Sequence, residues 1–329
     1  MTLVVVKRVQ DFLLIVSDTK LTDPTRCKWT PLDQSLKVVN IDSNWVVAFA
    51  GNTYFADVAL KQFSGSPAFH TASEILLSAH KESRRNPDGE TDFLLISVRT
   101  AAIHVFKGGI CNRSTCNTTW IGDGLAFDRF QRSFVPTGNP KKGDVSNIVR
   151  FERGTRAIRP AIVNDAVHQI CTRTSCAMAD VIQDSSIPSV GGFPITLVIG
   201  HERAQLWPEL SALFAKPNPD ISPSAERDIL FGEARTGDYN FEVIPAQIPS
   251  HNALAIYFRN ANYCLLFRRW DGGISFARPI REVTSEKIEQ RLARECNCAF
   301  WRINVRKETG GYGIGFDIPE NAAPLVQKN

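Results

Sequence analysis

The order of the predicted elements favours an α+β fold in which two antiparallel β-sheets stack face to face. Strand-forming runs open the chain, and two helical segments follow them before the strands return; a second pair of helical segments then precedes another strand. Helices that come in pairs between hairpins do not suit a doubly wound parallel sheet. We therefore expect a four-layer αββα sandwich, with helices outside each sheet, followed by a small C-terminal α+β module.

The strands of the sandwich are predicted from runs of apolar and β-branched residues. They lie at residues 2–8, 12–17, 36–50 with a break at 42–44, 92–109, 118–121 and 193–200. The first two strands form a hairpin, because only a short polar turn from Val9 to Asp11 separates them. Residues 18–34 are polar and contain two prolines, which predicts a loop.

Helices are predicted where apolar residues recur at helical spacing. They lie at residues 52–63, at 71–85, after Gly124 in a segment that carries Phe127, Phe130 and Phe134, and at 160–176. The second of these has the clearest start signal, since Thr71 and Glu74 fit a capping box.

The composition changes after residue 207. We assign residues 1–207 to the sandwich, 208–250 to a polar, proline-rich linker or wrap, and 251–329 to the C-terminal module. The module is predicted to contain strands at 253–258, 263–268, 274–278 and 300–306, and a helix at 283–296.

Charge and hydropathy exclude several classes of protein. A net charge of +4 is too small to indicate nucleic-acid binding. No run approaches the roughly 18 to 20 apolar residues of a membrane span, and the first residues do not form a signal peptide, so we expect a cytoplasmic protein. The eight cysteines lack the two-residue spacing of zinc hooks. We expect them to be reduced thiols, and we expect no metal and no cofactor.

Thr2 is the first residue with catalytic potential. Threonine is small enough for methionine aminopeptidase to remove the preceding Met1. A free N-terminal threonine then holds a nucleophile and a base in one residue, because its α-amine has an ordinary pKa of about 7.7 to 8.0. Many chains begin with Met-Thr, so this observation needs support from the surrounding residues.

That support comes from the spacing of three later residues. Asp18 stands sixteen residues after Thr2, Lys37 opens a predicted strand, and Gly51 ends the next strand fourteen residues after Lys37. This arrangement resembles the opening of proteasome β-subunits and of the bacterial peptidase that partners an unfoldase ring, which are N-terminal nucleophile hydrolases. The resemblance covers roughly residues 2 to 205, and its most specific part is the first sixty residues.

The resemblance implies a role for each matched residue. Lys37 would favour the alkoxide of Thr2, Asp18 would keep the Lys37 ammonium charged, and the Gly51 N–H would stabilise an oxyanion. Thr22 and Phe49 would contact the substrate. Taken singly, Asp18 is equally an ordinary loop aspartate, and Lys37 an ordinary lysine on the surface of a strand.

Two later segments depart from the family pattern. The family has Gly-Ser-Gly before its third helix, where this chain has Gly122-Asp123-Gly124. The family then has Asp-x-x-Ser-Gly-Gly, whereas here Ser189 lies one position early and no aspartate occupies the expected place. We keep Asp123 and Ser189 as candidate catalytic residues, because Asp123 can accept a hydrogen bond from an α-ammonium. The same carboxylate can also raise the pKa of that amine and so weaken it as a base.

The resemblance thus predicts a threonine-type amidohydrolase or peptidase that acts on a peptide or another amide. It also implies a homo-oligomer. An ATPase partner is implied only by the resemblance to the peptidase that partners an unfoldase ring. The damaged second segment leaves an alternative, a non-catalytic scaffold or interaction protein. In a third interpretation, the C-terminal module binds a partner and the sandwich is its platform.

Overall fold

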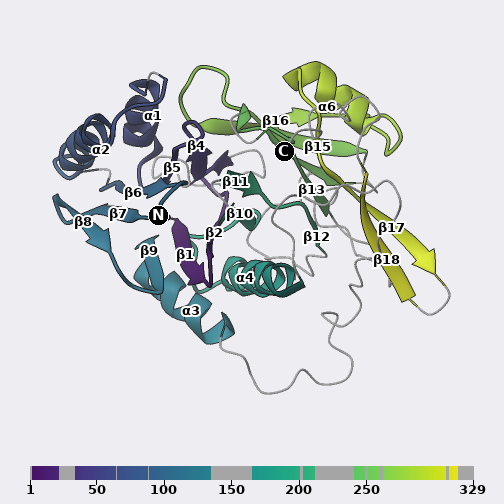
Figure 1. Ribbon diagram of the computed structural model, residues 1–329, viewed down its shortest axis with the longest axis horizontal. Helices are drawn as coiled ribbons and strands as arrows, with labels where there is room; N and C mark the ends of the chain where they lie inside the picture. The colour runs from purple at the N-terminus through teal and green to yellow at the C-terminus, as the bar shows by residue number, and fades with distance from the viewer. Residues whose placement is uncertain are drawn as a thin grey trace.

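The computed structural model (Figure 1) describes most of the chain. The described residues are 2–21, 34–63, 65–87, 89–134, 165–200, 203–211, 241–248, 251–258, 262–308 and 311–317. Within these ranges the chain forms five helices and four antiparallel sheets. None of the described helices is long and apolar enough to cross a membrane.

The first sheet has five strands in the order β11-β10-β2-β1-β9. Its strands are β1 (Leu3–Val9), β2 (Phe12–Ser17), β9 (Thr118–Gly122), β10 (Ile195–Gly200) and β11 (Arg203–Leu206). The predicted hairpin of β1 and β2 is confirmed, with Val4 opposite Ser17 and Val9 opposite Phe12. Side chains alternate along β1, so Val4 and Val6 face the largest core while neighbouring residues face helices.

The second sheet also has five strands, in sequence order from β4 to β8. They are β4 (Val38–Asn40), β5 (Trp45–Ala50), β6 (Asp92–Ser97), β7 (Ile103–Lys107) and β8 (Ile110–Ser114). Each strand pairs with the next in sequence. The β4–β5 and β6–β7 connections are short, and the first contains the strand break predicted at residues 42–44, whereas two helices lie between β5 and β6.

Two pairs of helices pack on these sheets. They are α1 (Thr53–Lys61) and α2 (Phe69–Ser83) on the second sheet, and α3 (Gly124–Phe134) and α4 (Asp165–Gln183) on the first. The predicted capping box at Thr71 is wrong, because α2 begins earlier, at Phe69, and its N-cap residue Ala68 makes no side-chain hydrogen bond. The helix itself is confirmed, and its residues Leu76 and Ala79 are buried against the second sheet.

A third large sheet occupies the C-terminal part of the chain, with strand order β12-β13-β14-β15-β16-β3. Its strands are β12 (Glu209–Ser211), β13 (Phe241–Pro245), β14 (Leu254–Phe258), β15 (Tyr263–Phe267), β16 (Ser275–Ile280) and the distant β3 (Ser35–Leu36). Helix α6 (Ile288–Cys296) covers one face, and β17 (Arg302–Glu308) and β18 (Gly311–Asp317) form a separate hairpin. Of the predicted linker, residues 212–240 and 249–250 lie outside the described residues.

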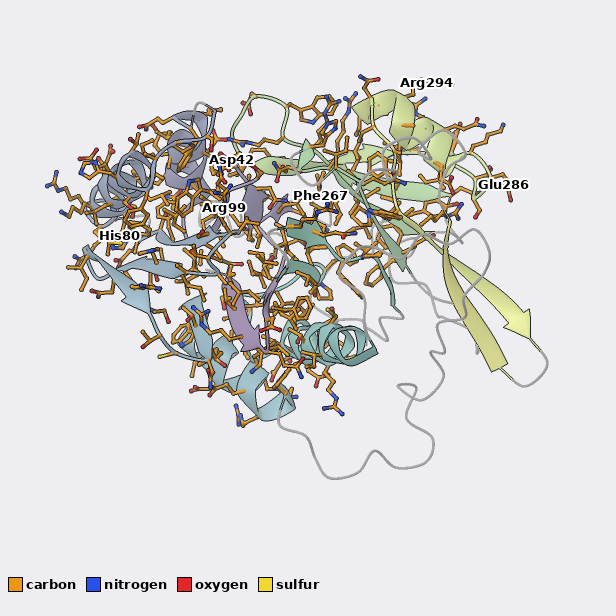
Figure 2. The ribbon with its side chains drawn as sticks, in the orientation of Figure 1. Asp42, His80, Arg99, Phe267, Glu286 and Arg294 are labelled. Atoms are coloured by element: carbon orange, nitrogen blue, oxygen red, sulfur yellow. The ribbon has the colours of Figure 1, made fainter. Side chains whose placement is uncertain are left out.

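The predicted two-sheet αββα sandwich is wrong, because three large sheets share the largest core. That core contains Val4 of β1, Val46 of β5 and Leu254 of β14, and Phe267 of β15 also belongs to it (Figure 2). The physical reason is that β14 and β15 are buried on both faces. One face joins the shared core, and the other face packs under α6 through residues such as Tyr257.

Candidate functional site

The turn geometry of the first hairpin brings Thr2 to Asp18. Because Val4 lies opposite Ser17, the residues just before β1 and just after β2 are neighbours, which accounts for their sixteen-residue spacing. The Thr2 hydroxyl donates a hydrogen bond to the Asp18 carboxylate, and the Leu3 N–H donates to the same oxygen at 3.1 Å. Thr2 is 1% exposed and Asp18 is fully buried.

Asp18 is held on its other side by a distant loop. The Gly191 N–H donates to the second carboxylate oxygen at 3.2 Å. Burial raises the pKa of Asp18 to about 6, against the opposing effect of the Lys37 charge and of the N–H groups of Leu3 and Gly191. The carboxylate therefore has three hydrogen-bond donors within the protein and a cation that acts on it.

Lys37 is the cation predicted to accompany Asp18, and it lies in a one-residue gap between β3 and β4. Its side chain is 2% exposed, so the alternative of a surface lysine does not apply. Burial lowers the pKa of Lys37 to about 8, and the charge of Asp18 offsets part of that effect. Thr2, Asp18 and Lys37 are thus all buried, and a hydrogen bond and a charge interaction link them.

Phe49 lies beside Lys37, within the protein rather than on an open surface. The Lys37 Nζ atom lies 5.6 Å from the centroid of the Phe49 ring, and the Phe49 N–H donates to the Lys37 carbonyl at 3.0 Å. Phe49 is fully buried in the core beneath α1 and α2. The structure therefore places it next to the site, packed against helices. Thr22, the other predicted substrate contact, lies outside the described residues.

Gly51 directly follows β5 and has a backbone conformation that requires glycine. Its φ is +123°, and a Cβ atom at this position would lie 2.0 Å from the Glu90 carbonyl oxygen. Asn52 follows and caps α1, since its side chain accepts a hydrogen bond from the Tyr54 N–H at 2.9 Å. Gly51 therefore lies directly before a helix N-terminus, where N–H groups favour negative charge.

A second glycine turn approaches Thr2 from β9. A Cβ atom on Gly122 would lie 1.9 Å from the Thr2 carbonyl oxygen and 3.2 Å from the Ala50 Cβ atom. The Asp123 N–H then donates to the Thr2 carbonyl at 2.9 Å. The turns at the ends of β5 and β9 therefore meet beside Thr2, and this contact fixes the threonine backbone.

Asp123 and Ser189, both taken from the altered segments, contact each other. The Ser189 hydroxyl donates to the Asp123 carboxylate at 2.6 Å, and the other carboxylate oxygen caps α3 by accepting from the N–H groups of Leu125 and Ala126. Partial burial alone would raise the pKa of Asp123, but the bonds from Ser189, Ala126 and Leu125 lower it overall. One oxygen of the Asp123 carboxylate therefore binds Ser189, and the other caps α3.

Several neighbours of Asp18 were not predicted as site residues. The Thr19 hydroxyl donates to the Gln34 side chain at 2.6 Å and accepts from the Phe193 N–H at 2.9 Å. The ammonium of Lys20 donates to the Pro188 carbonyl at 2.6 Å, and burial lowers its pKa while Asp18 acts in the opposite direction. The glycine pair at 191 and 192 was visible in the sequence, yet only the fold shows that it reaches Asp18.

One other cluster has residue types that bind metals. His80, Glu90 and Asp92 could each direct a ligand atom to a common point, and His80 (Figure 2) is fully buried. However, its Nδ1 atom lies 2.8 Å from the Thr91 carbonyl, and its Nε2 atom lies 2.8 Å from the Gly109 N–H. Both ring nitrogens are therefore engaged by the backbone, which suits a structural histidine better than a metal ligand.

No protein-family model matches this chain, and no curated protein matches it either.

Proposed function

We propose that the protein is a threonine-type amidohydrolase whose nucleophile is the Thr2 hydroxyl after removal of Met1. The observation that supports this most strongly is the buried group of Thr2, Asp18 and Lys37. A buried lysine that lacks a partner loses its proton readily, and the carboxylate of Asp18 opposes that loss. A buried pair of opposite charges is costly to maintain for structure alone.

The proposed reaction proceeds in two steps. The Thr2 Oγ atom attacks the amide carbonyl carbon, and its proton passes to the free α-amine of Thr2. That amine then protonates the leaving nitrogen as the C–N bond breaks, which leaves an ester on Thr2. A water molecule gives a proton to the same amine and attacks the ester carbon. As the ester C–O bond breaks, the ammonium returns that proton to the Thr2 Oγ atom, which releases the acid and restores the free hydroxyl and amine.

The surrounding residues divide the supporting roles. Lys37 favours the alkoxide form of Thr2 through its charge, and Asp18 orients the hydroxyl while it keeps that charge in place. The Gly51 N–H, at the start of α1, stabilises the oxyanion of the tetrahedral intermediate. Asp123 and Ser189 fix the turn that holds the Thr2 carbonyl. The substrate is a peptide bond or another amide. The proposed location is the cytoplasm, where methionine aminopeptidase can remove Met1.

A comparison of two N-termini tests the proposal. The chain is released at Thr2 from a ubiquitin fusion and compared with the same chain that retains Met1, with fluorogenic acyl-amides as substrates. Only the chain with a free Thr2 amine is expected to hydrolyse them, and Thr2→Ala is expected to abolish the activity. Equal activity of the two chains, or full activity of Thr2→Ala, refutes the mechanism.

A non-catalytic scaffold is the second candidate, and one observation favours it. Thr2 is only 1% exposed, and its hydroxyl is already bonded to Asp18. A scaffold requires no free amine, so a folded, Met1-free chain that fails with every acyl-amide supports this candidate. The homo-oligomer expected from the resemblance is checked by sedimentation velocity on the same samples.

A further inference from the structure

The chain changes sheets at Lys37. The preceding strand, β3, belongs to the third sheet, where Leu36 lies opposite Ser275 and Ser35 lies opposite Phe276. The following strand, β4, belongs to the second sheet. The backbone on one side of Lys37 is therefore held by residues about 240 positions away in sequence, because Ser275 minus Leu36 is 239.

The backbone on the other side of Lys37 is held by Asn252. The Asn40 N–H donates to the Asn252 side-chain oxygen at 2.6 Å, and the Asn252 side-chain nitrogen donates to the Asn40 carbonyl at 2.6 Å. One amide group thus takes the place of a neighbouring strand along the edge strand β4. Both residues are buried, so these bonds have no competition from bulk water.

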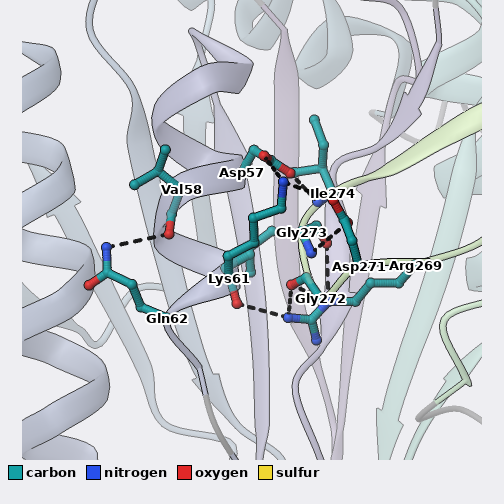
Figure 3. Close-up of polar contacts among 10 residues, drawn as sticks. Asp57, Val58, Lys61, Gln62, Arg269, Asp271, Gly272, Gly273 and Ile274 are labelled. Carbon is teal, nitrogen blue, oxygen red and sulfur yellow. Dashed lines mark hydrogen bonds and ion pairs between the residues drawn. The ribbon is translucent and has the colours of Figure 1, made fainter.

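A further contact of the third sheet reaches α1, the helix that follows Gly51 (Figure 3). The Ile274 N–H donates to the Asp57 carboxylate at 3.0 Å, and Arg269 donates to the Leu60 carbonyl at 2.9 Å. Lys61 lies 2.7 Å from Asp57 and 2.8 Å from Asp271. A Cβ atom on Gly273 would lie 1.9 Å from Asp57, so the loop approaches the helix as closely as glycine allows.

We infer that the third sheet is a part of the Thr2 site, and that Asn252 is a positioning residue that holds the backbone of Lys37 in place. Lys37 is 2% exposed, so its side chain is packed on all sides and the backbone around it decides where the ammonium lies. That backbone is fixed by Ser275 before Lys37 and by Asn252 after it. The catalytic consequence rests on the proposed function; the placement of Lys37 does not.

The inference opposes the view of the C-terminal module as a separate partner-binding unit on a self-sufficient sandwich. If the third sheet positions Lys37, a substitution at Asn252 changes the reactivity of Lys37, which lies 215 positions earlier, since 252 minus 37 is 215. The substitution is made in the full chain, because the first two sheets share their core with the third.

The test replaces Asn252 with glycine, which tolerates the left-handed backbone at this residue (φ +46°) and removes both bonds to Asn40. Asn262→Gly is the matched control, because Asn262 has φ +49° in the same part of the chain and is exposed. Competitive acetylation with acetic anhydride, followed by peptide mass spectrometry, measures the reactivity of Lys37 without any need for catalysis. Hydrolysis of the acyl-amide is measured on the same samples.

Asn252→Gly is expected to raise the acetylation rate of the neutral Lys37 amine, corrected for its pKa, about tenfold, because local opening replaces a fixed backbone. It is also expected to move the pKa of Lys37 upward, whereas Asn262→Gly leaves both unchanged. If Asn252→Gly does not unfold cooperatively, Asn252→Asp is used for the test instead. The aspartate keeps the oxygen that accepts from the Asn40 N–H and lacks the nitrogen that donates to the Asn40 carbonyl. Unchanged Lys37 reactivity in the folded Asn252 variants overturns the inference. An altered Lys37 in a chain whose parent hydrolyses nothing refutes the proposed function and leaves the inference intact.

Discussion

The hydroxyl of Thr2 donates a hydrogen bond to the carboxylate of Asp18, sixteen residues farther along the chain. The β1–β2 hairpin sets this spacing, because its register places the residue before β1 beside the residue after β2. Lys37 then adds a buried positive charge that acts on the same carboxylate. In the proposed mechanism this pair of opposite charges activates Thr2, and the pair is also costly to bury.

The charge pair predicts an unequal response to single and double substitution. Lys37→Met leaves the Asp18 carboxylate buried without its cation, so we expect a loss of about 3 kcal/mol in the free energy of unfolding at pH 7. Asp18→Asn combined with Lys37→Met removes both charges and is expected to recover at least about 1 kcal/mol of that loss. Urea unfolding of the three proteins measures this. A double variant no more stable than Lys37→Met contradicts the pairing.

The same two groups predict how stability depends on pH. The pKa of Asp18 is raised to about 6 in the folded chain, so the folded state binds more protons than the unfolded state between about pH 4 and 6. The contribution of Asp18 to the free energy of unfolding therefore falls as pH rises through this window. Lys37, lowered to about 8, binds fewer protons when folded, so its contribution rises from about pH 8 to 10.5.

Subtraction of a variant isolates the effect at acid pH. The stability difference between the parent and Asp18→Asn is expected to change by about 2 kcal/mol between pH 4 and 6, in the direction that disfavours the parent at the higher pH. Thermal or urea unfolding across this range provides the measurement. A difference that stays constant with pH would show that Asp18 titrates at its ordinary pKa.

Gly51 is predicted to tolerate no side chain. In Gly51→Ala the new methyl group meets the Glu90 carbonyl in a backbone with φ +123°, so we expect a loss of about 2 kcal/mol or more in the free energy of unfolding. Gly124→Ala is the matched control, because its methyl group meets only Trp120 at 3.7 Å, an ordinary contact. The control is expected to lie within about 0.5 kcal/mol of the parent or above it. Equal stability of the two variants would contradict the close approach at Gly51.

Ser189 is predicted to set the acidity of Asp123. Loss of the 2.6 Å hydrogen bond in Ser189→Ala raises the pKa of the Asp123 carboxyl, since that bond stabilises its ionised form. Ser186→Ala is the control, because Ser186 makes the same kind of bond to Asp184 instead. Carboxyl chemical shifts followed by NMR titration report both groups. An Asp123 titration that is identical in parent and Ser189→Ala would exclude the contact.

Much of the secondary structure could be predicted from the sequence because it is locally encoded. The β1–β2 hairpin and the helix after Gly124 both follow from short-range periodicity and turn residues. The sheet arrangement could not be predicted, because nothing local shows that Leu36 pairs with Ser275. The run from Leu254 to Phe258 is apolar on both faces, which is the one sign that its sheet joins a larger core.

The candidate site divides in the same way. Asp18 and Lys37 could be predicted because their spacing along the chain resembles that of a known family. Their burial agrees with the roles expected for them. The contact of Ser189 with Asp123 joins segments 66 residues apart, and the bonds of Asn252 to Asn40 span 212 residues. Such pairs depend on tertiary packing, so no motif in a single sequence reveals them.

Covalent capture of Thr2 tests the central claim most directly. A peptide epoxyketone offers two electrophilic carbons, one for the Thr2 hydroxyl and one for its free α-amine, so a doubly bonded adduct requires both groups at residue 2. Intact mass and N-terminal peptide mapping of the chain that begins at Thr2 are expected to show one adduct on Thr2, and none in Lys37→Met or in the chain with Met1. A folded Thr2 chain that stays unmodified, or an adduct on another residue, would contradict the account.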